Sequence, residues 1–225
     1  EQEIVSSELE TVAALLQARK KEPPPPPPAP VETEEETGSN LVTFRFLGLK
    51  TDKTRILLMV DMNKYLAEHE ALIQRTVARA LSSLQPGYEF AILGFQQVDA
   101  GPRFHRWPED GSLAKMSRSS RSQALQFVNR LSGKYEGGSS LQSAFREGFA
   151  STAEALILIS DGLPNPDFNS NLPPRALLQD ISISNRQKKE VHAVTVGDYF
   201  KYKGTVEFME SLARANSGGF LALAQ

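Results

Sequence analysis

The chain has 225 residues, of which 40% are hydrophobic and 23% charged, and its formal net charge is −2. This composition is ordinary for a folded globular protein and excludes a disordered chain, which would be poorer in large apolar residues. The sequence holds no uncharged apolar run of transmembrane length. The absence of cysteine excludes disulfides, thiolate catalysis and cysteine-ligated metal sites.

The charge is divided unevenly along the chain. Residues 1–40 carry nine Glu against three basic residues, a net charge of −6, and residues 41–225 carry 18 acidic and 22 basic residues, a net charge of +4. Nucleic-acid binding usually requires a clustered basic face. The sequence shows neither such a cluster nor an RNA-binding motif, so we expect no nucleic-acid partner.

The first segment, residues 1–21, is predicted to form an amphipathic helix. Leu9, Val12, Ala13 and Leu16 recur at helical spacing, and a basic triplet ends the segment. Such a helix either docks on a partner or remains solvated. Short isolated helices are marginally stable, which favours the solvated alternative.

Residues 22–40 are predicted to form a linker. Six consecutive prolines, residues 23–28, favour a stiff polyproline II rod, and residues 31–40 are acidic with a terminal Gly-Ser-Asn. Proline runs bind SH3-like domains or serve as stalks, and we favour the stalk.

Residues 41–225 are predicted to form one α/β domain. Short apolar runs predict buried strands, and longer periodic segments between them predict helices. This alternation is typical of a mainly parallel sheet covered by helices on both faces. The predicted strands are 41–47, 55–60, 88–95, 104–107, 155–160, 191–196 and 220–223, and the predicted helices are 66–84, 121–131, 140–151, 173–187 and 205–216.

Polar side chains follow the ends of two of these strands. Asp61 follows the run at 55–60, and Asp161 follows the run at 155–160. Ligands of open α/β sheets bind beyond the carboxyl ends of the strands, so we expect the two carboxylates to meet there. With Asn63, Ser139 and Ser140 they form a set of hard oxygen donors, which suits Mg²⁺ or Ca²⁺.

Four segments, in this order and spacing, resemble the von Willebrand factor type A (vWA) domain. They are RILLMVDMNKYL at 55–66, GGSSLQSAF at 137–145, LILISDGLPN at 156–165 and FMESLARANSGGFLAL at 208–223. FLGL at 46–49 is similar to the lead-in of bacterial members. The resemblance implies a doubly wound, Rossmann-like sheet of about six strands with one short antiparallel edge.

The resemblance also implies a metal-ion-dependent adhesion site, in which two Ser and a Thr hold Mg²⁺ between two Asp. Asp61 and Asp161 match that pattern, and Ser139 replaces the Thr. Asn63 and Tyr65 stand where the two Ser are expected. A phenol cannot place its oxygen where a Ser oxygen lies, and Mg²⁺ requires near-ideal octahedral geometry. We therefore expect no cofactor, with weak Mg²⁺ or Ca²⁺ binding as the alternative.

By this resemblance we predict a non-enzymatic protein-interaction module in a bacterial envelope-associated assembly. An unidentified protein partner would dock on the rim formed by Asp61, Asn63, Tyr65, Ser139, Ser140, Asp161, Asn165 and Phe168. One alternative is an adhesion module with a working Mg²⁺ or Ca²⁺ site. Another is a Rossmann-like enzyme acting on a phosphorylated small molecule, although the sequence lacks a phosphate-binding loop motif.

The stalk and the absence of an initiator Met predict an extracytoplasmic protein, periplasmic or in the cell envelope, with a membrane tether upstream of residue 1. A cytoplasmic location is the alternative. His69, His105 and His192 lack metal-ligand spacing and are interpreted as surface or core residues.

Overall fold

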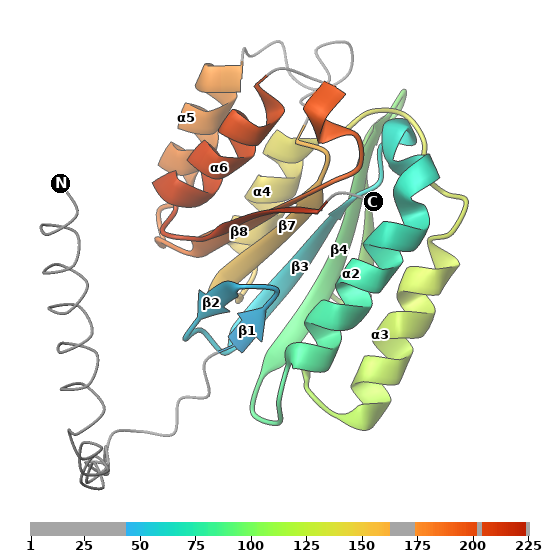
Figure 1. Cartoon of the computed structure of the whole chain (residues 1–225). Helices are drawn as coiled ribbons and strands as arrows, with labels where there is room; N and C mark the ends of the chain where they lie inside the picture. Colours follow the sequence, from blue (N-terminus) through green and yellow to red (C-terminus); the bar gives the residue numbers. More distant parts are fainter. Residues whose placement is uncertain (1–43, 163–173, 202–203, 224–225) are drawn as a thin grey trace, which may run out of the picture. The chain divides into compact units, whose positions relative to one another are not determined.

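The computed structural model describes residues 44–162, 174–201 and 204–223 (Figure 1). The predicted N-terminal helix at 1–21 and the linker at 22–40 lie outside these ranges, as do the rim residues Asn165 and Phe168. Among the described helices, none has the length and apolar character needed to cross a membrane.

A seven-stranded sheet forms the centre of the described fold. Its order is β5-β4-β3-β7-β8-β9, and the short β6 pairs with β4. The β3–β4, β3–β7, β7–β8 and β8–β9 pairs are parallel, whereas β5 and β6 run antiparallel to β4. The strands are β3 (Arg55–Asp61), β4 (Glu89–Val98), β5 (Gly101–Trp107), β6 (Ala114–Lys115), β7 (Ala155–Ser160), β8 (Glu190–Val196) and β9 (Phe220–Leu223).

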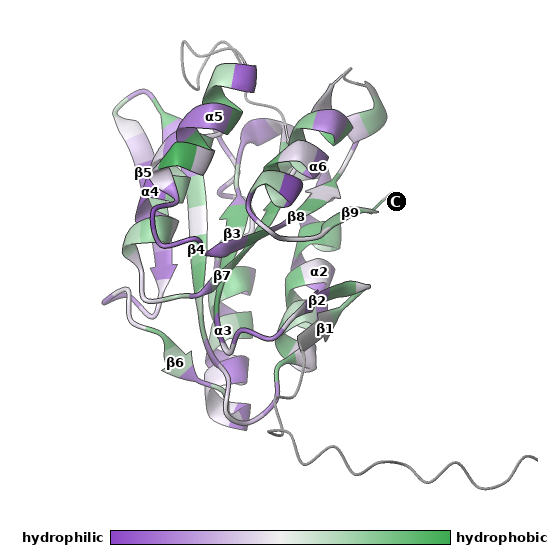
Figure 2. Cartoon of the chain, turned by 90° about the vertical axis from the view of Figure 1, so that its left-hand side faces the viewer, coloured by the Kyte–Doolittle hydropathy of each residue, from purple (hydrophilic) through white to green (hydrophobic). Residues whose placement is uncertain are grey.

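The apolar runs become strands that are buried on both faces. All six residues of β7 are buried, as are the last six of β3. Figure 2 shows these strands as a hydrophobic layer between the helices. The prediction of an α/β domain with a mainly parallel sheet is confirmed, and the sheet has one strand more than expected because β6 joins it.

Helices pack against both faces of the sheet (Figure 1). Buried residues of α2 (Glu70–Ser83) and α3 (Arg118–Arg130) share one hydrophobic cluster with Ile56, Leu58 and Val60. On the other face, Leu57 and Met59 share a second cluster with α4 (Leu141–Ala150), α5 (Pro174–Ser184) and α6 (Thr205–Ala215). Alternate residues of β3 therefore enter opposite cores, as the period of a strand requires.

The predicted strand at 41–47 is shorter and lies outside the main sheet. Within the part of the chain that the structure describes, Phe44–Phe46 (β1) pairs with Leu49–Thr51 (β2) as a two-stranded hairpin. Its two-residue turn, Leu47 and Gly48, has φ of 49° and 97°, the positive values of a type I′ turn. Phe46 and Leu49 are buried in the cluster that includes α2, so the hairpin covers part of that core.

Side chains tie this hairpin to the start of β8. Thr51 Oγ1 donates to Glu190 Oε2 at 2.5 Å, and His192 Nε2 lies 3.3 Å from the same oxygen. The Gly219 N–H donates to His192 Nδ1 at 3.0 Å, so a neutral ring with its proton on Nε2 satisfies both partners. Burial lowers the pKa of His192, in agreement with this neutral form.

A buried lysine donates hydrogen bonds to backbone carbonyls at the C-terminal end of α4. Lys189 Nζ donates to the carbonyl oxygens of Gly148 and Ser151, at 3.2 and 2.5 Å. These carbonyls belong to the last turn of α4 and its C-cap, where helices leave backbone acceptors without partners. The ammonium group therefore joins the start of β8 to the helix that covers it.

Candidate functional site

The candidate site lies at the point where the strand order reverses. From β3 the chain builds the sheet toward β4 and β5, and β7 then starts the other half through β8 and β9. Val60 pairs with Ile159, so the next residues of the two strands, Asp61 and Ser160, lie side by side at the carboxyl edge. This position is where open α/β sheets bind ligands.

Asp61 is fully buried at this edge. Its Oδ2 accepts a hydrogen bond from Ser160 Oγ at 2.8 Å, and its Oδ1 accepts one from the Asn63 N–H at 3.2 Å. Ser160 Oγ also accepts the Gly162 N–H at 3.0 Å, which fixes the hydroxyl toward Asp61. Sequence reasoning omitted Ser160 from the site, although its place at the end of β7, beside the end of β3, could have indicated it.

Asn63 links the two halves of the sheet. Its Oδ1 accepts the Tyr65 N–H at 2.9 Å, which caps the 3₁₀ helix η1 (Lys64–His69). Because the oxygen is occupied by this donor, Nδ2 faces the other way and donates to both carboxylate oxygens of Asp161, each at 3.2 Å. An amide nitrogen therefore lies within hydrogen-bond distance of both carboxylate oxygens of Asp161.

Tyr65 does not contribute to this buried cluster. Its side chain is 44% exposed, and the Lys64 ammonium group lies 5.0 Å from its ring centroid. The expected helix at 66–84 also differs, because it begins as η1 and becomes α-helical only at Glu70. The Asn63 cap sets the start of η1 and thereby directs the Tyr65 ring outward.

The loop before α4 brings Ser139 and Ser140 to the same edge. Gln97 and Gly138 exchange two backbone hydrogen bonds of 2.8 Å, and the Lys64 N–H donates to the Gly137 carbonyl at 3.2 Å. Gly137 has φ of 64°, and a Cβ there would lie 1.9 Å from the Gln97 carbonyl oxygen, so only glycine fits.

Several buried hydroxyl groups at this edge lack hydrogen-bond partners within the described part of the chain. Ser139 and Ser140 start α4, Thr195 pairs with Ser160 across β8 and β7, and Thr205 opens α6 beside Gly162. Buried hydroxyls are normally satisfied by protein or water. These four hydroxyl groups are therefore available to form hydrogen bonds with water or with a bound ligand.

The electrostatics of the site favour a protonated Asp61. Burial, followed by the charge of Asp161, raises its pKa from 3.8 to about 8, against the opposing effect of the hydrogen bonds from the Ser160 hydroxyl and the Asn63 N–H. Two carboxylates in one buried site resist simultaneous ionisation. At neutral pH the cluster therefore carries about one negative charge rather than two.

A pocket of about 230 Å³ lies beside this cluster, between η1 and the ends of β7 and β8. It includes Glu68, His69 and Asp198, which the sequence did not assign to the site. His69 is 7% exposed and lies against Gly197, consistent with its interpretation as a core residue. The residues that line the pocket are Lys64, Tyr65, Leu66, Glu68, His69, Asp161 and Asp198.

Of the predicted site residues, the structure brings Asp61, Asn63 and Asp161 into direct contact and places Ser139 close to Asp61. Ser140 lies in the same loop, and Tyr65 lies on the solvent side of the rim. Among the described residues, no group of three acidic or histidine side chains is arranged to hold a metal ion.

No protein-family model matches this chain, and neither does any curated protein. Among solved structures, the pilus adhesin SpaC from Lactobacillus rhamnosus GG matches with a TM-score of 0.57 and 18% identity, over 76% of this chain and 28% of that chain. Proximal thread matrix protein 1 from the mussel byssus matches with a TM-score of 0.50 and 13% identity, over 75% and 41%. This chain spans less than half the length of either structure, and at these identities the likeness shows the fold alone.

Proposed function

We propose that this chain is a non-enzymatic protein-interaction module with a doubly wound vWA-type domain, located at the bacterial cell surface in an envelope-associated assembly. A partner protein docks on the rim that surrounds the buried side chains of Asp61, Asn63 and Asp161 and that exposes Tyr65. The predicted rim residues Asn165 and Phe168 remain part of the proposal, although they lie outside the described residues. The fold likeness to a domain of a pilus adhesin supports the cell-surface role.

The observation that carries the proposal is the orientation of the Asn63 amide. A neutral donor satisfies both oxygens of Asp161, and the Tyr65 N–H holds that donor in place. The oxygen of Asn63 is directed away from Asp161, so a cation at that position would meet an N–H group. The residues present fit Mg²⁺ poorly, and partner contacts at the rim are independent of divalent cations.

A second candidate, an adhesion module with a working metal site, is favoured by the buried hydroxyl groups of Ser139 and Ser140. These oxygens lie at the carboxylate edge and lack protein partners among the described residues. If Asn63 changed rotamer, a cation could meet Asp61, Asp161 and Ser139 together. Oxygen donors of this kind are those that Mg²⁺ and Ca²⁺ prefer.

The third candidate, an enzyme for a phosphorylated small molecule, has less support. The N-terminus of α4 is directed at the edge of the sheet, but Asp61 and Asp161 are buried beside it. The negative charge of this buried pair repels a phosphate group, and the sequence carries no phosphate-binding loop motif to offset it. Turnover of phosphate esters that disappears in Asp61→Asn would support this candidate against our proposal.

Thermal unfolding of the full chain separates the first two candidates. A ligand that binds only the folded state raises the midpoint temperature. We expect the same midpoint in EDTA, millimolar Mg²⁺ and millimolar Ca²⁺. A rise of several degrees with either cation, abolished by Asp161→Asn, would establish the metal-dependent candidate instead.

Site-specific photo-crosslinking in native cells tests the docking surface. A photoreactive phenylalanine analogue replaces Tyr65 on the rim in one variant and Ile183 on α5 in a control variant, because both side chains are exposed. We expect a discrete protein adduct from position 65 that persists in EDTA and is absent from position 183. Adducts from position 183 alone would contradict docking at the rim.

A further inference from the structure

The two outer strands of the main sheet differ in how they are protected against pairing with a further strand. β5 is the outer strand on one side and β9 the outer strand on the other, and within the described residues neither has a strand beyond it. An outer strand presents backbone N–H and C=O groups that are not used within the sheet. Native proteins usually block such an edge with charged side chains, with proline or with a covering element.

The outer strand β5 carries this protection. It contains Pro102, which lacks a backbone N–H, and two arginines. Arg103 forms an ion pair with Glu136, and Arg106 forms one with Glu147. A strand added beside β5 would remove water from some of these charged groups, and this cost opposes pairing.

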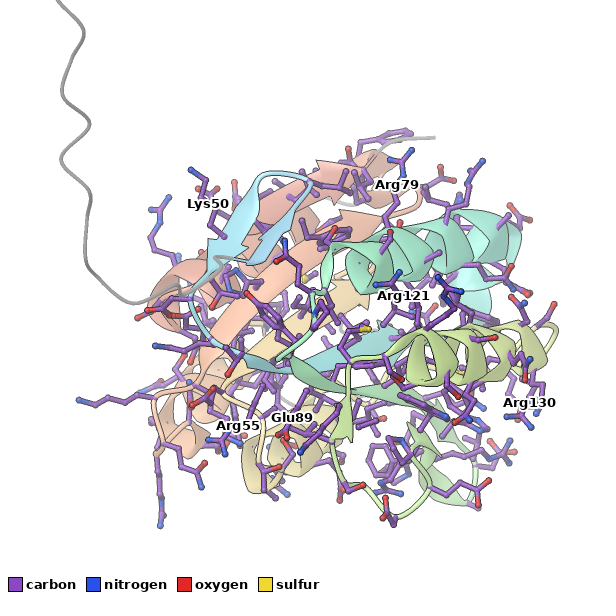
Figure 3. All side chains as sticks on the ribbon, turned by 90° about the horizontal axis from the view of Figure 1, so that it is seen from below. Lys50, Arg55, Arg79, Glu89, Arg121 and Arg130 are labelled. Atoms are coloured by element: carbon purple, nitrogen blue, oxygen red, sulfur yellow. The ribbon has the colours of Figure 1, made fainter. Side chains whose placement is uncertain are left out.

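The outer strand β9 lacks these protective features, and we call its free side the β9 edge (Phe220–Leu223). Residues 215–225 contain no charged side chain and no proline. Ala222 is exposed, and the other three residues of the strand are half-buried. Phe220 packs beside the core under α6, whereas Leu221 and Leu223 pack beside the opposite core, so apolar side chains reach solvent on both faces. Charged side chains are frequent on other elements, and Figure 3 labels Lys50, Arg55, Arg79, Glu89, Arg121 and Arg130.

We propose that the β9 edge pairs with the β9 edge of a second copy of this chain, with the two strands antiparallel about a two-fold axis. An occupant of this edge has to be an extended strand without charges and with apolar side chains on both faces, and β9 itself meets these requirements. When Ala222 of one copy lies opposite Ala222 of the other, Leu221 lies opposite Leu223 on the same face of the joined sheet. The edge is therefore complementary to itself, as a two-fold contact requires.

The helix α6 flanks the proposed contact. It packs against both β8 and β9, and Figure 2 shows it beside these strands. A two-fold axis perpendicular to the sheet places the two copies of α6 on the same face of the joined sheet, one on each side of the axis. α6 contains Glu207, Glu210 and Arg214, so neither copy presents charges of a single sign to the other. Electrostatic repulsion between the helices therefore does not oppose the pairing.

Antiparallel pairing directs the rims of the two copies toward opposite ends of the dimer. β9 runs parallel to β8, and β8 and β3 are each parallel to β7. The carboxyl ends of these strands in one copy therefore lie beside the amino ends in the other. Such a dimer carries one rim at each end and is able to bridge two partner proteins. This bridging role rests on the proposed function, whereas the pairing of β9 does not.

Sedimentation velocity of the full chain tests the pairing. We expect a monomer–dimer equilibrium at protein concentrations up to about 0.2 mM. Ala222→Arg places a charge on the β9 edge and should weaken self-association at least about tenfold, whereas Ala71→Arg, at an exposed position of α2, should change it less than about twofold. A chain that stays monomeric would overturn the proposal, and so would a dimer that Ala222→Arg leaves intact, for example one held by residues 1–21. Because Ala222 is exposed, the variant should keep the melting midpoint of the native protein.

An introduced cysteine tests the position of the contact, because the chain contains no other thiol. Residues directly opposite each other in antiparallel strands have Cα atoms about 5 Å apart, a separation that a disulfide spans. Oxidation with diamide should convert Ala222→Cys into a covalent dimer, whereas Ala71→Cys at the same concentration should stay monomeric on a non-reducing gel. Equal yields of covalent dimer from the two variants, or none from Ala222→Cys, would overturn the two-fold pairing of β9.

Discussion

Replacing Asp61 with Asn changes how the stability of the domain depends on pH. In the folded chain, burial and Asp161 raise the pKa of Asp61 to about 8, whereas its ordinary value is 3.8. Between these values the unfolded chain releases the proton and the folded chain keeps it. Deprotonation of the unfolded state alone lowers the free energy of unfolding of the native protein as the pH rises.

The size of the effect follows from the two pKa values. Each pKa unit corresponds to about 1.4 kcal/mol, so the difference between 3.8 and about 8 amounts to at most about 6 kcal/mol. Asn is nearly isosteric with a protonated Asp, and its amide can hydrogen-bond with Ser160 Oγ as the carboxyl group does. We therefore expect Asp61→Asn to match the native protein near pH 4 and to exceed it in stability by several kcal/mol at pH 8.

Urea unfolding in EDTA at unit steps from pH 4 to pH 8 measures this difference. Asp99→Asn, at an exposed position after β4, is the matched control and should follow the native curve. A difference between Asp61→Asn and the native protein that stays constant across this range would refute the inferred protonation of the buried pair.

Three further predictions concern the rim and two other buried groups. Asn63→Ser combined with Tyr65→Ser removes the blocking amide and supplies two small hydroxyls, so we expect Mg²⁺ binding detectable by calorimetry; no heat would show that the edge lacks the inferred geometry. Lys189→Met leaves the Ser151 carbonyl at the C-cap of α4 without its donor, whereas the Gly148 carbonyl keeps the Ser151 hydroxyl, and it should cost about 1–3 kcal/mol in urea unfolding; a loss below about 0.5 kcal/mol would contradict this role. Because burial lowers the pKa of His192, the unfolded chain binds the extra proton first, and stability falls as the pH drops below 6.5. His192→Gln should reduce this acid sensitivity in melting scans between pH 7 and pH 5.

The sequence predicts the strands of the core well because each of them is a continuous run of apolar residues. The run at 155–160 is a strand over the predicted residues, and the run at 55–60 extends by one residue, Asp61. Continuous apolar residues between polar ends leave few alternatives to a strand buried on both faces. The parallel order of the sheet follows from the helices that separate these strands.

The details of the site depend on contacts between residues that are far apart in the sequence. Such contacts cannot be predicted from sequence patterns alone. Asn63 and Asp161 are 98 positions apart, and the direction of the Asn63 amide is decided by the Tyr65 N–H. The 3₁₀ turn before α2 likewise follows from this cap. The hairpin at 44–51 leaves the main sheet because Phe46 and Leu49 pack against α2, a choice made by tertiary packing.

The hairpin is attached to the sheet at the end opposite the rim, and this determines how a pulling force would act on the strands. Through Thr51 it is attached to Glu190 at the amino end of β8, whereas the rim lies at the carboxyl ends of the strands (Figure 1). A partner held at the rim and pulled against the amino-terminal side of the domain would load β3, β7 and β8 along their length. The hydrogen bonds between parallel strands run across that direction, so they would have to shear together rather than open one at a time. If the proposed partner docks at the rim, the sheet would therefore resist such a load through many hydrogen bonds at once.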